Sequence, residues 1–210
     1  MIYIIKHRKY DNPIPEGYIE YGVGDLFKKE KDNLNKYNLY LNEVQGLYHI
    51  WKYAKEDIVG LCHYRRFFWY KNDYLKLEDA EEILKKYDII VAPKVSFNMN
   101  LYYQLRFEVE NSDKLDKYLN LFYKEVPEFE EYLKETGFNN REIFVCKKEL
   151  IDKYCEWLFP IILPITEQFD KEDKDTDCNQ RLISQIIERL FSYWLRKENL
   201  KIYEMEYKDI

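Results

Sequence analysis

Short apolar runs and amphipathic stretches alternate along this chain. Runs rich in β-branched and other apolar residues predict strands over residues 2–5, 18–23, 57–62, 88–92 and 143–146, and an alternating pattern predicts a last strand over residues 202–207. Apolar residues at helical spacing predict helices over residues 42–55, 77–86, 101–133 and 148–169, and a last, most regular one that carries residues 182–194. We expect Asn42 to cap the first helix, Pro127 to break the third, and Pro160 and Pro164 to bend or end the fourth.

The order of these elements predicts the fold class. A strand, a helix and a strand follow one another over residues 57–92, and this order indicates a parallel sheet. The charge-rich segment 101–133 is typical of an excursion over one face of such a sheet. The sequence contains no linker of Gly, Ser or Pro and no internal repeat. We therefore predict a single α/β domain over residues 1–210, with a mostly parallel central sheet flanked by helices.

Composition and charge limit the classes of partner. With 33 basic and 39 acidic residues the net charge is -6, so no overall basic field attracts nucleic acid or an anionic membrane. An anion must therefore be held by a local cluster. The four cysteines lack the spacing of a zinc site, and we expect them to be reduced. No apolar run approaches the roughly 20 residues of a membrane span, and the N-terminus does not resemble a signal peptide, so we expect a cytoplasmic protein.

The run GLCHYRRFF, residues 60–68, places cationic groups where an apolar strand ends. Ligands of open α/β sheets bind at the carboxyl ends of strands. An unpaired buried guanidinium costs several kcal/mol, so Arg65 and Arg66 need partners or solvent. Together with His63 they form a set of donors suited to a phosphate or diphosphate. Salt bridges from the two arginines to helices on either side of the sheet agree with the sequence equally well.

Two other basic groups follow predicted strands. Lys6, His7 and Arg8 end the first strand, and Lys94 follows Pro93 after the strand over residues 88–92. If these strands are parallel, both groups meet residues 63–66 at one edge of the sheet. The sequence has no glycine-rich phosphate loop, so it matches neither a Rossmann nor a Walker site.

Two acidic features have a structural as well as a functional interpretation. The run DKDTD, residues 173–177, has the spacing of a metal-binding DxD, but Cys178 stands where an EF-hand needs glycine, and a solvated loop that caps the next helix is the better interpretation. On that helix, Arg181 and Glu188 lie two turns apart on one face. Glu188 fits a general base in a cleft, whereas an internal ion pair between this helix and the sheet explains the residues equally and is favoured.

Several motifs occur in an order that is found in a known family. They are Asn38, Glu43, residues 47–48 (LY), 50–52 (IWK), Asp57, residues 59–61 (VGL) and 63–68 (HYRRFF), with His7, the segment 84–94, the YCEWLF run at 154–159 and the R-x6-E-R-L run at 181–190 in the same order. The chain thereby resembles a bacterial family, formerly of unknown function, whose genes lie in clusters for capsular polysaccharide, exopolysaccharide and lipopolysaccharide. Its hallmark is N-x-x-x-x-E-L-T-x-L-Y-W-I-W-K followed by a strand that ends in G-L-x-H-Y-R-R-Y-F.

The resemblance implies a GT-A-like glycosyltransferase that binds a nucleotide-sugar at the carboxyl ends of its strands. Enzymes of that type usually hold Mn or Mg through a DxD; HYRR stands in its place here, so we expect cationic donors to replace the metal and no cofactor to be needed. The donor is expected to be a UDP-sugar, and the base to be Glu188 or Glu142. The residues expected to bind the nucleotide-sugar are His7, His63, Arg65, Arg66, Lys94 and Arg181.

The implied acceptor is a lipid-linked oligosaccharide or glycan at the inner face of the membrane, with at most peripheral membrane contact. Departures from the family pattern concentrate in the acceptor half: Glu142 replaces an Asn, and a histidine usual in segment 106–110 is missing. His49 and Asn42 also differ from the family's Trp and Cys. The alternative function is a noncatalytic module that binds a nucleotide or glycan, or a partner subunit. An open cleft that contains Glu142, segment 106–110 and the two arginines would favour catalysis.

Overall fold

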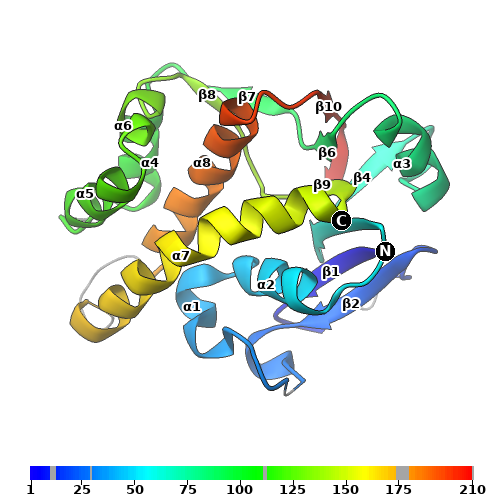
Figure 1. Cartoon of the computed structure of the whole chain (residues 1–210), viewed down its shortest axis with the longest axis horizontal. Helices are drawn as coiled ribbons and strands as arrows, with labels where there is room; N and C mark the ends of the chain where they lie inside the picture. Colours follow the sequence, from blue (N-terminus) through cyan, green and yellow to red (C-terminus); the bar gives the residue numbers. More distant parts are fainter. Residues whose placement is uncertain (10–12, 29, 111–112, 174–179, 210) are drawn as a thin grey trace.

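Six strands form the main path of the sheet in the structure, a computed structural model that describes residues 1–9, 13–28, 30–110, 113–173 and 180–209. The strands are β1 (Ile2–Lys6), β2 (Tyr18–Gly22), β3 (Ile58–His63), β6 (Ile89–Val91), β9 (Phe144–Lys147) and β10 (Ile202–Glu204). They lie in the order β10–β6–β9–β3–β1–β2 (Figure 1). Five of them run in one direction, and β9 is antiparallel between β3 and β6. The predicted mostly parallel sheet is confirmed, although β3 and β6 are not neighbours.

An antiparallel extension continues the sheet beyond β3. It consists of β4 (Arg66–Tyr70), β5 (Asp73–Tyr74) and β11 (Tyr207–Asp209), with β4 paired to each of β3, β5 and β11. A separate two-stranded sheet pairs β7 (Lys94–Ser96) with β8 (Gly137–Asn139). The predicted single strand over residues 202–207 is wrong, because the chain leaves β6 after Glu204 and pairs next with β4. The strand β4 was not predicted, since its arginine and aromatic residues do not alternate simply.

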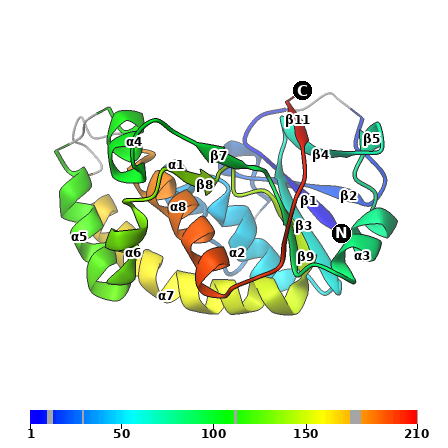
Figure 2. The ribbon, with the colours of Figure 1, turned by 90° about the horizontal axis from the view of Figure 1, so that it is seen from above.

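Eight α-helices within the described ranges surround these sheets. They are α1 (Asn38–Leu41), α2 (Val44–Tyr53), α3 (Leu77–Leu84), α4 (Leu101–Glu108), α5 (Leu115–Glu125), α6 (Glu128–Tyr132), α7 (Lys148–Glu172) and α8 (Leu182–Lys197). Two short 3-10 turns, η1 (Gly24–Leu26) and η2 (Asn35–Tyr37), precede α1. Figures 1 and 2 show α4, α5 and α6 grouped at the end of the molecule remote from α3, which agrees with an excursion over residues 101–133.

One local prediction about the helices was wrong, and of the two alternatives predicted for the prolines, bending or ending the helix, the second does not occur. Asn42 does not cap α2: its backbone has a φ of 47°, and its side-chain amide donates a hydrogen bond of 2.7 Å to Ser184 Oγ on α8. The long helix α7 does not end at its prolines but continues through both Pro160 and Pro164 to Glu172. Proline removes one backbone donor. Since α7 buries a long apolar face, packing compensates for the lost hydrogen bonds.

The hydrophobic core lies on both faces of the sheet. In β1, Ile2 and Ile4 face the smaller cluster formed with α3 and β4, whereas Tyr3 and Ile5 face the larger cluster formed with α2, α7 and α8. This alternation follows from the two-residue period of a strand. Gly46 brings α2 close to β1, since a Cβ at this position would lie 2.2 Å from Cδ1 of Ile5. The N-terminus of α2 is thereby held beside the carboxyl end of β1.

Two further expectations concern the oxidation state of the cysteines and the presence of membrane-spanning helices. Cys62, Cys146 and Cys155 are buried free thiols, as predicted; Cys178 lies outside the described residues. None of the helices in the described ranges combines the length and apolarity needed to cross a membrane.

Candidate active site

A cleft of about 1180 Å³ opens at the carboxyl ends of β2, β1 and β3. Its volume exceeds the roughly 300–1,000 Å³ that is typical of small-molecule pockets, so the cleft is large enough for an extended ligand. The walls come from the loops that follow these strands, the start of α1, the β7–β8 sheet and the first turns of α8. Residues of the predicted site that line it are His7, His63, Arg65, Arg66, Arg181 and Glu188. The sequence thus located the cleft correctly, at the strand ends where the chain leaves the sheet.

The HYRR run forms the tight turn of a hairpin between β3 and β4. His63 ends β3 and pairs with Arg66, the first residue of β4, and Tyr64 and Arg65 make the turn. The ring of Tyr64 lies between two guanidinium groups, 5.3 Å from Cζ of Arg65 and 5.6 Å from that of Arg8. His7 packs edge-on against the same ring, with 5.1 Å between centroids. The basic groups that follow β1 and β3 therefore meet around one buried aromatic ring, as predicted.

His63 is engaged within the protein. Burial, followed by the nearby positive charges of Arg66 and Arg65, lowers the pKa of His63 to about 3, so its imidazole is neutral. Nδ1 accepts the backbone N–H of Arg65 at 3.2 Å, which leaves the proton on Nε2, 3.3 Å from Oε1 of Glu43. The expected role as a donor to a diphosphate is therefore replaced by a structural one: His63 links the hairpin turn to Glu43.

The two arginines of the hairpin differ in their surroundings. Arg65 is exposed in the cleft and makes no ion pair with any described residue. Arg66 is half-buried, and its Nε donates a hydrogen bond of 3.0 Å to Oδ1 of Asp209 on β11. Salt bridges to helices on either side of the sheet, the structural interpretation of these residues, are absent from the described part of the chain.

Glu188 is a partly buried carboxylate on the wall of the cleft. It has no hydrogen bond or ion pair with any described residue. Removal from water raises its pKa to about 7, an effect that Glu108 and Glu43 reinforce and that Arg189 and Arg141 oppose. A carboxylate with a pKa in this range can exchange a proton near neutral pH.

The ion pair between this helix and the sheet, favoured from the sequence for Glu188, is not found among the described residues; a different internal ion pair joins α8 to α4. Arg189, the neighbour of Glu188, is fully buried and donates to Oε2 of Glu108 on α4 at 2.6 Å and to the backbone oxygen of Gln185 at 2.6 Å. The guanidinium also donates to Gln104 and lies 4.6 Å from the centre of the Phe138 ring. This network holds α8 to α4 and leaves the carboxylate of Glu188 directed to the cleft.

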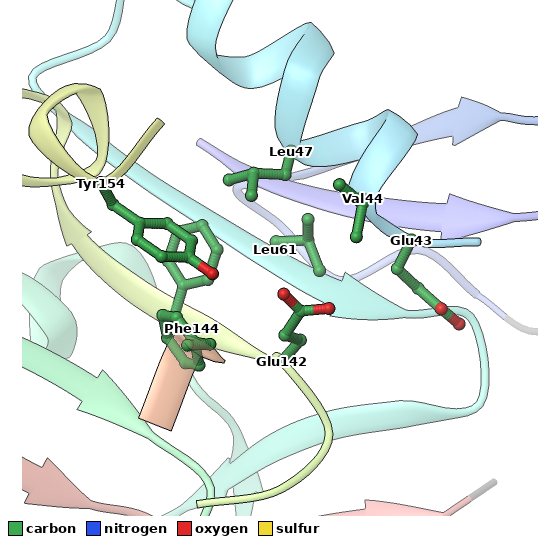
Figure 3. Close-up of a pocket in the computed structure, with 8 residues that line it drawn as sticks. Glu43, Val44, Leu47, Leu61, Glu142, Phe144 and Tyr154 are labelled. Atoms are coloured by element: carbon green, nitrogen blue, oxygen red, sulfur yellow. The ribbon is translucent and has the colours of Figure 1, made fainter. Parts of the chain in front are cut away.

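Glu142 lies in a separate, small cavity of about 10 Å³ beside the cleft (Figure 3). The walls are mostly apolar but include Glu43 and Tyr154, and Figure 3 shows the carboxyl group of Glu142 next to Leu61, with the hydroxyl of Tyr154 directed toward it. Oε1 of Glu142 and the hydroxyl of Tyr154 have no hydrogen-bond partner in the described chain. Burial raises the pKa of Glu142 well above its usual value, and the charges of Glu188 and Glu43 raise it further. The protonated form of Glu142 is therefore favoured relative to an exposed glutamate.

Of the other positions expected near the site, Lys94 lies outside the cleft and segment 106–110 contributes one residue to its wall. Lys94 does not line the cleft: on β7, Val95 faces it, and the strand alternation turns Lys94 to the opposite side. Segment 106–110 contributes Glu108 to the wall.

The possible metal-binding run DKDTD is described only in part: Asp175 and Asp177 lie outside the described residues. In the described part of the chain, His, Cys, Asp and Glu side chains form no group of three that could hold a metal ion.

Sequence analysis missed two residues of the site. Glu43 begins α2 and lines both the cleft and the small cavity; its place in the N-x-x-x-x-E motif was a signal, but only the structure shows it beside His63. Arg141 also lines the cleft, and its φ of 82° is unusual for a residue other than glycine. No pattern in the sequence distinguishes Arg141 from the other charged loop residues.

Comparison with known proteins identifies the family. Residues 1–199 match the model of a family described as Domain of unknown function (DUF4422). The chain belongs to the DUF4422 family. A search of curated proteins gave no match. The structure of this chain is similar to a solved apo structure of WbbM, a bifunctional glycosyltransferase, with a TM-score of 0.80 and 20% sequence identity.

The likeness to WbbM covers the whole of this chain and 45% of that chain. At this identity it shows a common fold, and it confirms the expectation that this DUF4422 protein has a glycosyltransferase-like α/β architecture. The chain spans less than half of WbbM, so the activity of the complete WbbM protein is not transferred with the fold.

Proposed function

We propose that this protein is a glycosyltransferase that moves a sugar from a nucleotide-sugar, a UDP-sugar in the first instance, to a hydroxyl group of a surface-polysaccharide intermediate. The observation that carries the proposal is the composition of the cleft: the exposed guanidinium of Arg65 and the half-buried one of Arg66 share it with Glu188, a carboxylate with no ion pair to a described residue and a pKa of about 7. Cationic groups for a leaving diphosphate and a base for an incoming hydroxyl are the two elements that transfer requires.

The cationic wall serves the leaving group. As the bond from the sugar to the diphosphate breaks, its electron pair and negative charge remain on the phosphate oxygen. Arg65 and Arg66 neutralise that charge, and the guanidinium of Arg66 is positioned before the reaction by its hydrogen bond to Asp209. His7 and Arg181 lie on the same cleft and are assigned to the nucleotide-sugar; Lys94 is not, since its side chain faces away. Guanidinium groups take the place of a metal ion in this account.

Glu188 serves as the base in the proposed reaction. The acceptor oxygen forms a bond to the anomeric carbon, and its proton passes to the Glu188 carboxylate. Glu188 lines the cleft and is partly ionised at neutral pH, whereas Glu142 lies in the separate small cavity and burial raises its pKa well above its usual value, so Glu142 is the less suitable base. Of the two carboxylates predicted from the sequence, we therefore assign the role to Glu188.

The acceptor is proposed from the family resemblance and the shape of the cleft. Val95, Phe97 and Phe138, from the β7–β8 sheet and the chain beside it, give the cleft an apolar and aromatic part. A lipid-linked oligosaccharide or another glycan of capsule or lipopolysaccharide synthesis would place its terminal sugar there, and the protein would act in the cytoplasm with at most peripheral membrane contact.

Release of UDP from a panel of common UDP-sugars tests the proposal. Wild-type protein should release UDP in the presence of a glycan acceptor, and the Glu188→Gln variant should not. The alternative, a noncatalytic binding module, is supported by the location of Glu142 outside the cleft. It predicts nucleotide binding without release of UDP for every donor and acceptor.

A further inference from the structure

The backbone at residues 141–142 divides two side chains between two cavities. Arg141 and Glu142 have φ angles of 82° and 47°, so two consecutive residues other than glycine occupy the left-handed region. Arg141 lines the cleft, whereas Glu142 enters the small apolar cavity. Strained conformations of this kind persist where the surrounding structure enforces them, and they concentrate at functional sites. The strain here has a visible result: it places a guanidinium group in the cleft.

The strand β11 contacts Arg141 and Arg66 together. Nε of Arg141 donates a hydrogen bond of 3.4 Å to the hydroxyl of Tyr207, and Nε of Arg66 donates one of 3.0 Å to Oδ1 of Asp209. Tyr207 and Asp209 are two residues apart in β11, so they lie on the same face of the strand. Both contacts use Nε, and an arginine has four further N–H donors on its terminal nitrogens.

The opposite face of β11 anchors the strand. Nζ of Lys208 lies 3.2 Å from the centre of the Trp69 ring, and β11 pairs in antiparallel register with β4. The strand is therefore fixed to the same hairpin that carries Arg65 and Arg66. The charges of Glu188 and Asp209 also attract the Arg141 guanidinium, which is half-buried. Arg141 is thus held by its hydrogen bond to Tyr207 and by its attraction to the carboxylates of Glu188 and Asp209.

We propose that Arg141 and Arg66 together bind the diphosphate of a nucleoside diphosphate, with Tyr207 and Asp209 as positioning residues that set the direction of the two guanidinium groups. The proposal rests on the proposed function for the identity of the ligand, but the anion site itself does not need it. Two fixed guanidinium groups match the oxygens of a diphosphate, since each can donate two parallel hydrogen bonds. Tyr207 and Asp209 lie beyond the residues that match the family model, which end at residue 199.

Binding of UDP, uridine and inorganic pyrophosphate to purified protein, without metal, tests this site by calorimetry. Arg141→Ala should weaken the binding of UDP and pyrophosphate by about 10- to 100-fold, the effect of removing charge-assisted hydrogen bonds to a phosphate, and leave uridine unchanged. Asp209→Asn and Tyr207→Phe should weaken UDP by a smaller factor, and Asp209→Glu should restore it. The matched control is Arg196→Ala, which removes an exposed arginine paired to Glu135 far from the cleft. The unfolding midpoint of each variant separates lost binding from lost folding.

The outcomes separate this site from the proposed function. Binding of pyrophosphate and UDP that depends on Arg141 supports the site. Binding that is as tight in Arg141→Ala as in the wild type overturns it and leaves the proposed function standing. Pyrophosphate binding that depends on Arg141, together with no binding of any nucleoside diphosphate, supports the anion site and contradicts the nucleotide-sugar function. No binding of either anion by folded wild-type protein overturns both.

Discussion

Nε2 of His63 lies 3.3 Å from Oε1 of Glu43, and the imidazole ring of His63 is neutral. The histidine is 3% exposed, and both of its ring nitrogens contact the protein. His63, the histidine of the HYRR run, therefore connects the turn to the start of α2, while the two arginines after it line the cleft. This arrangement explains how a short motif can supply both a rigid turn and an exposed cationic wall.

The pH dependence of stability follows from this buried histidine. Its pKa is about 3 in the folded protein and about 6.5 in the unfolded chain, so the unfolded state binds more protons between these values. The His63 contribution is complete above pH 6.5 and is lost as the pH falls toward 3, at up to about 1.4 kcal/mol per pH unit. Urea unfolding of wild type and His63→Gln between pH 7 and 4.5 checks this. A free energy of unfolding that falls equally steeply in both proteins would contradict it.

Substitution of the proposed base should separate chemistry from binding. We expect Glu188→Gln to lower kcat by about 10²- to 10⁴-fold with little change in the donor KM. The carboxylate must be ionised to act. Wild-type kcat should therefore be low at acidic pH, rise as the pH increases through about 7, and level off above it. Steady-state kinetics over pH 5.5–8.5 give both results. Equal kcat in Glu188→Gln would remove this residue from the mechanism.

Glu142→Gln is the matched control for the base and has its own effect on stability. Gln resembles the protonated carboxyl group, so we expect activity within a few-fold of wild type. Burial raises the pKa of Glu142 above its unfolded value, so its contribution is complete below about pH 4.5 and is lost as the pH rises toward the folded pKa. Glu142→Gln should therefore be more stable than wild type at pH 8 and gain nothing at pH 4. The reverse order, measured by thermal unfolding, would show that Glu142 is ionised.

The ion pair between α8 and α4 should contribute strongly to stability. Arg189→Ala leaves Glu108 and Gln104 without their buried partner and opens a void beside Phe138, so we expect a loss of about 3–5 kcal/mol. Arg196 is also on α8; Arg196→Ala breaks its exposed pair with Glu135, which follows α6, and should cost less than about 1 kcal/mol. Chemical denaturation of the two variants measures the difference. Similar small losses would mean that the buried network is replaced by water.

Most of the fold could be predicted from local patterns. The runs that form β1, β3 and β9 and the helical spacing of α3 and α8 were sufficient, because one periodicity dominates each segment. The insertion of β9 between β3 and β6 could not be predicted, since strand order depends on contacts between distant residues. The division of residues 202–207 between two pairings has the same cause.

Part of the candidate site was predictable: the basic residues near the strand ends and, from α8 and the residue before it, Glu188 and Arg181. His7, Arg65 and Arg66 follow strands directly, so the position of the strand ends locates them. Glu43 and Arg141 enter the cleft through the close approach of α2 and through a positive φ, neither of which a sequence pattern records. The partnership of Arg189 with Glu108, and the resulting freedom of Glu188, likewise arises from packing between α8 and α4.

The central claim is that the cleft binds a nucleotide-sugar through guanidinium groups. Thermal unfolding of the wild type and of Arg65→Ala/Arg66→Ala, with UDP, GDP, CMP and common UDP-sugars in the presence and absence of Mn, tests it most directly. A ligand at 100 times its dissociation constant adds about 2.7 kcal/mol to the free energy of unfolding. We predict such a stabilisation by one nucleotide without Mn and its loss in the double variant. No stabilisation of folded wild-type protein, or one that requires Mn and survives the loss of both arginines, would contradict the account.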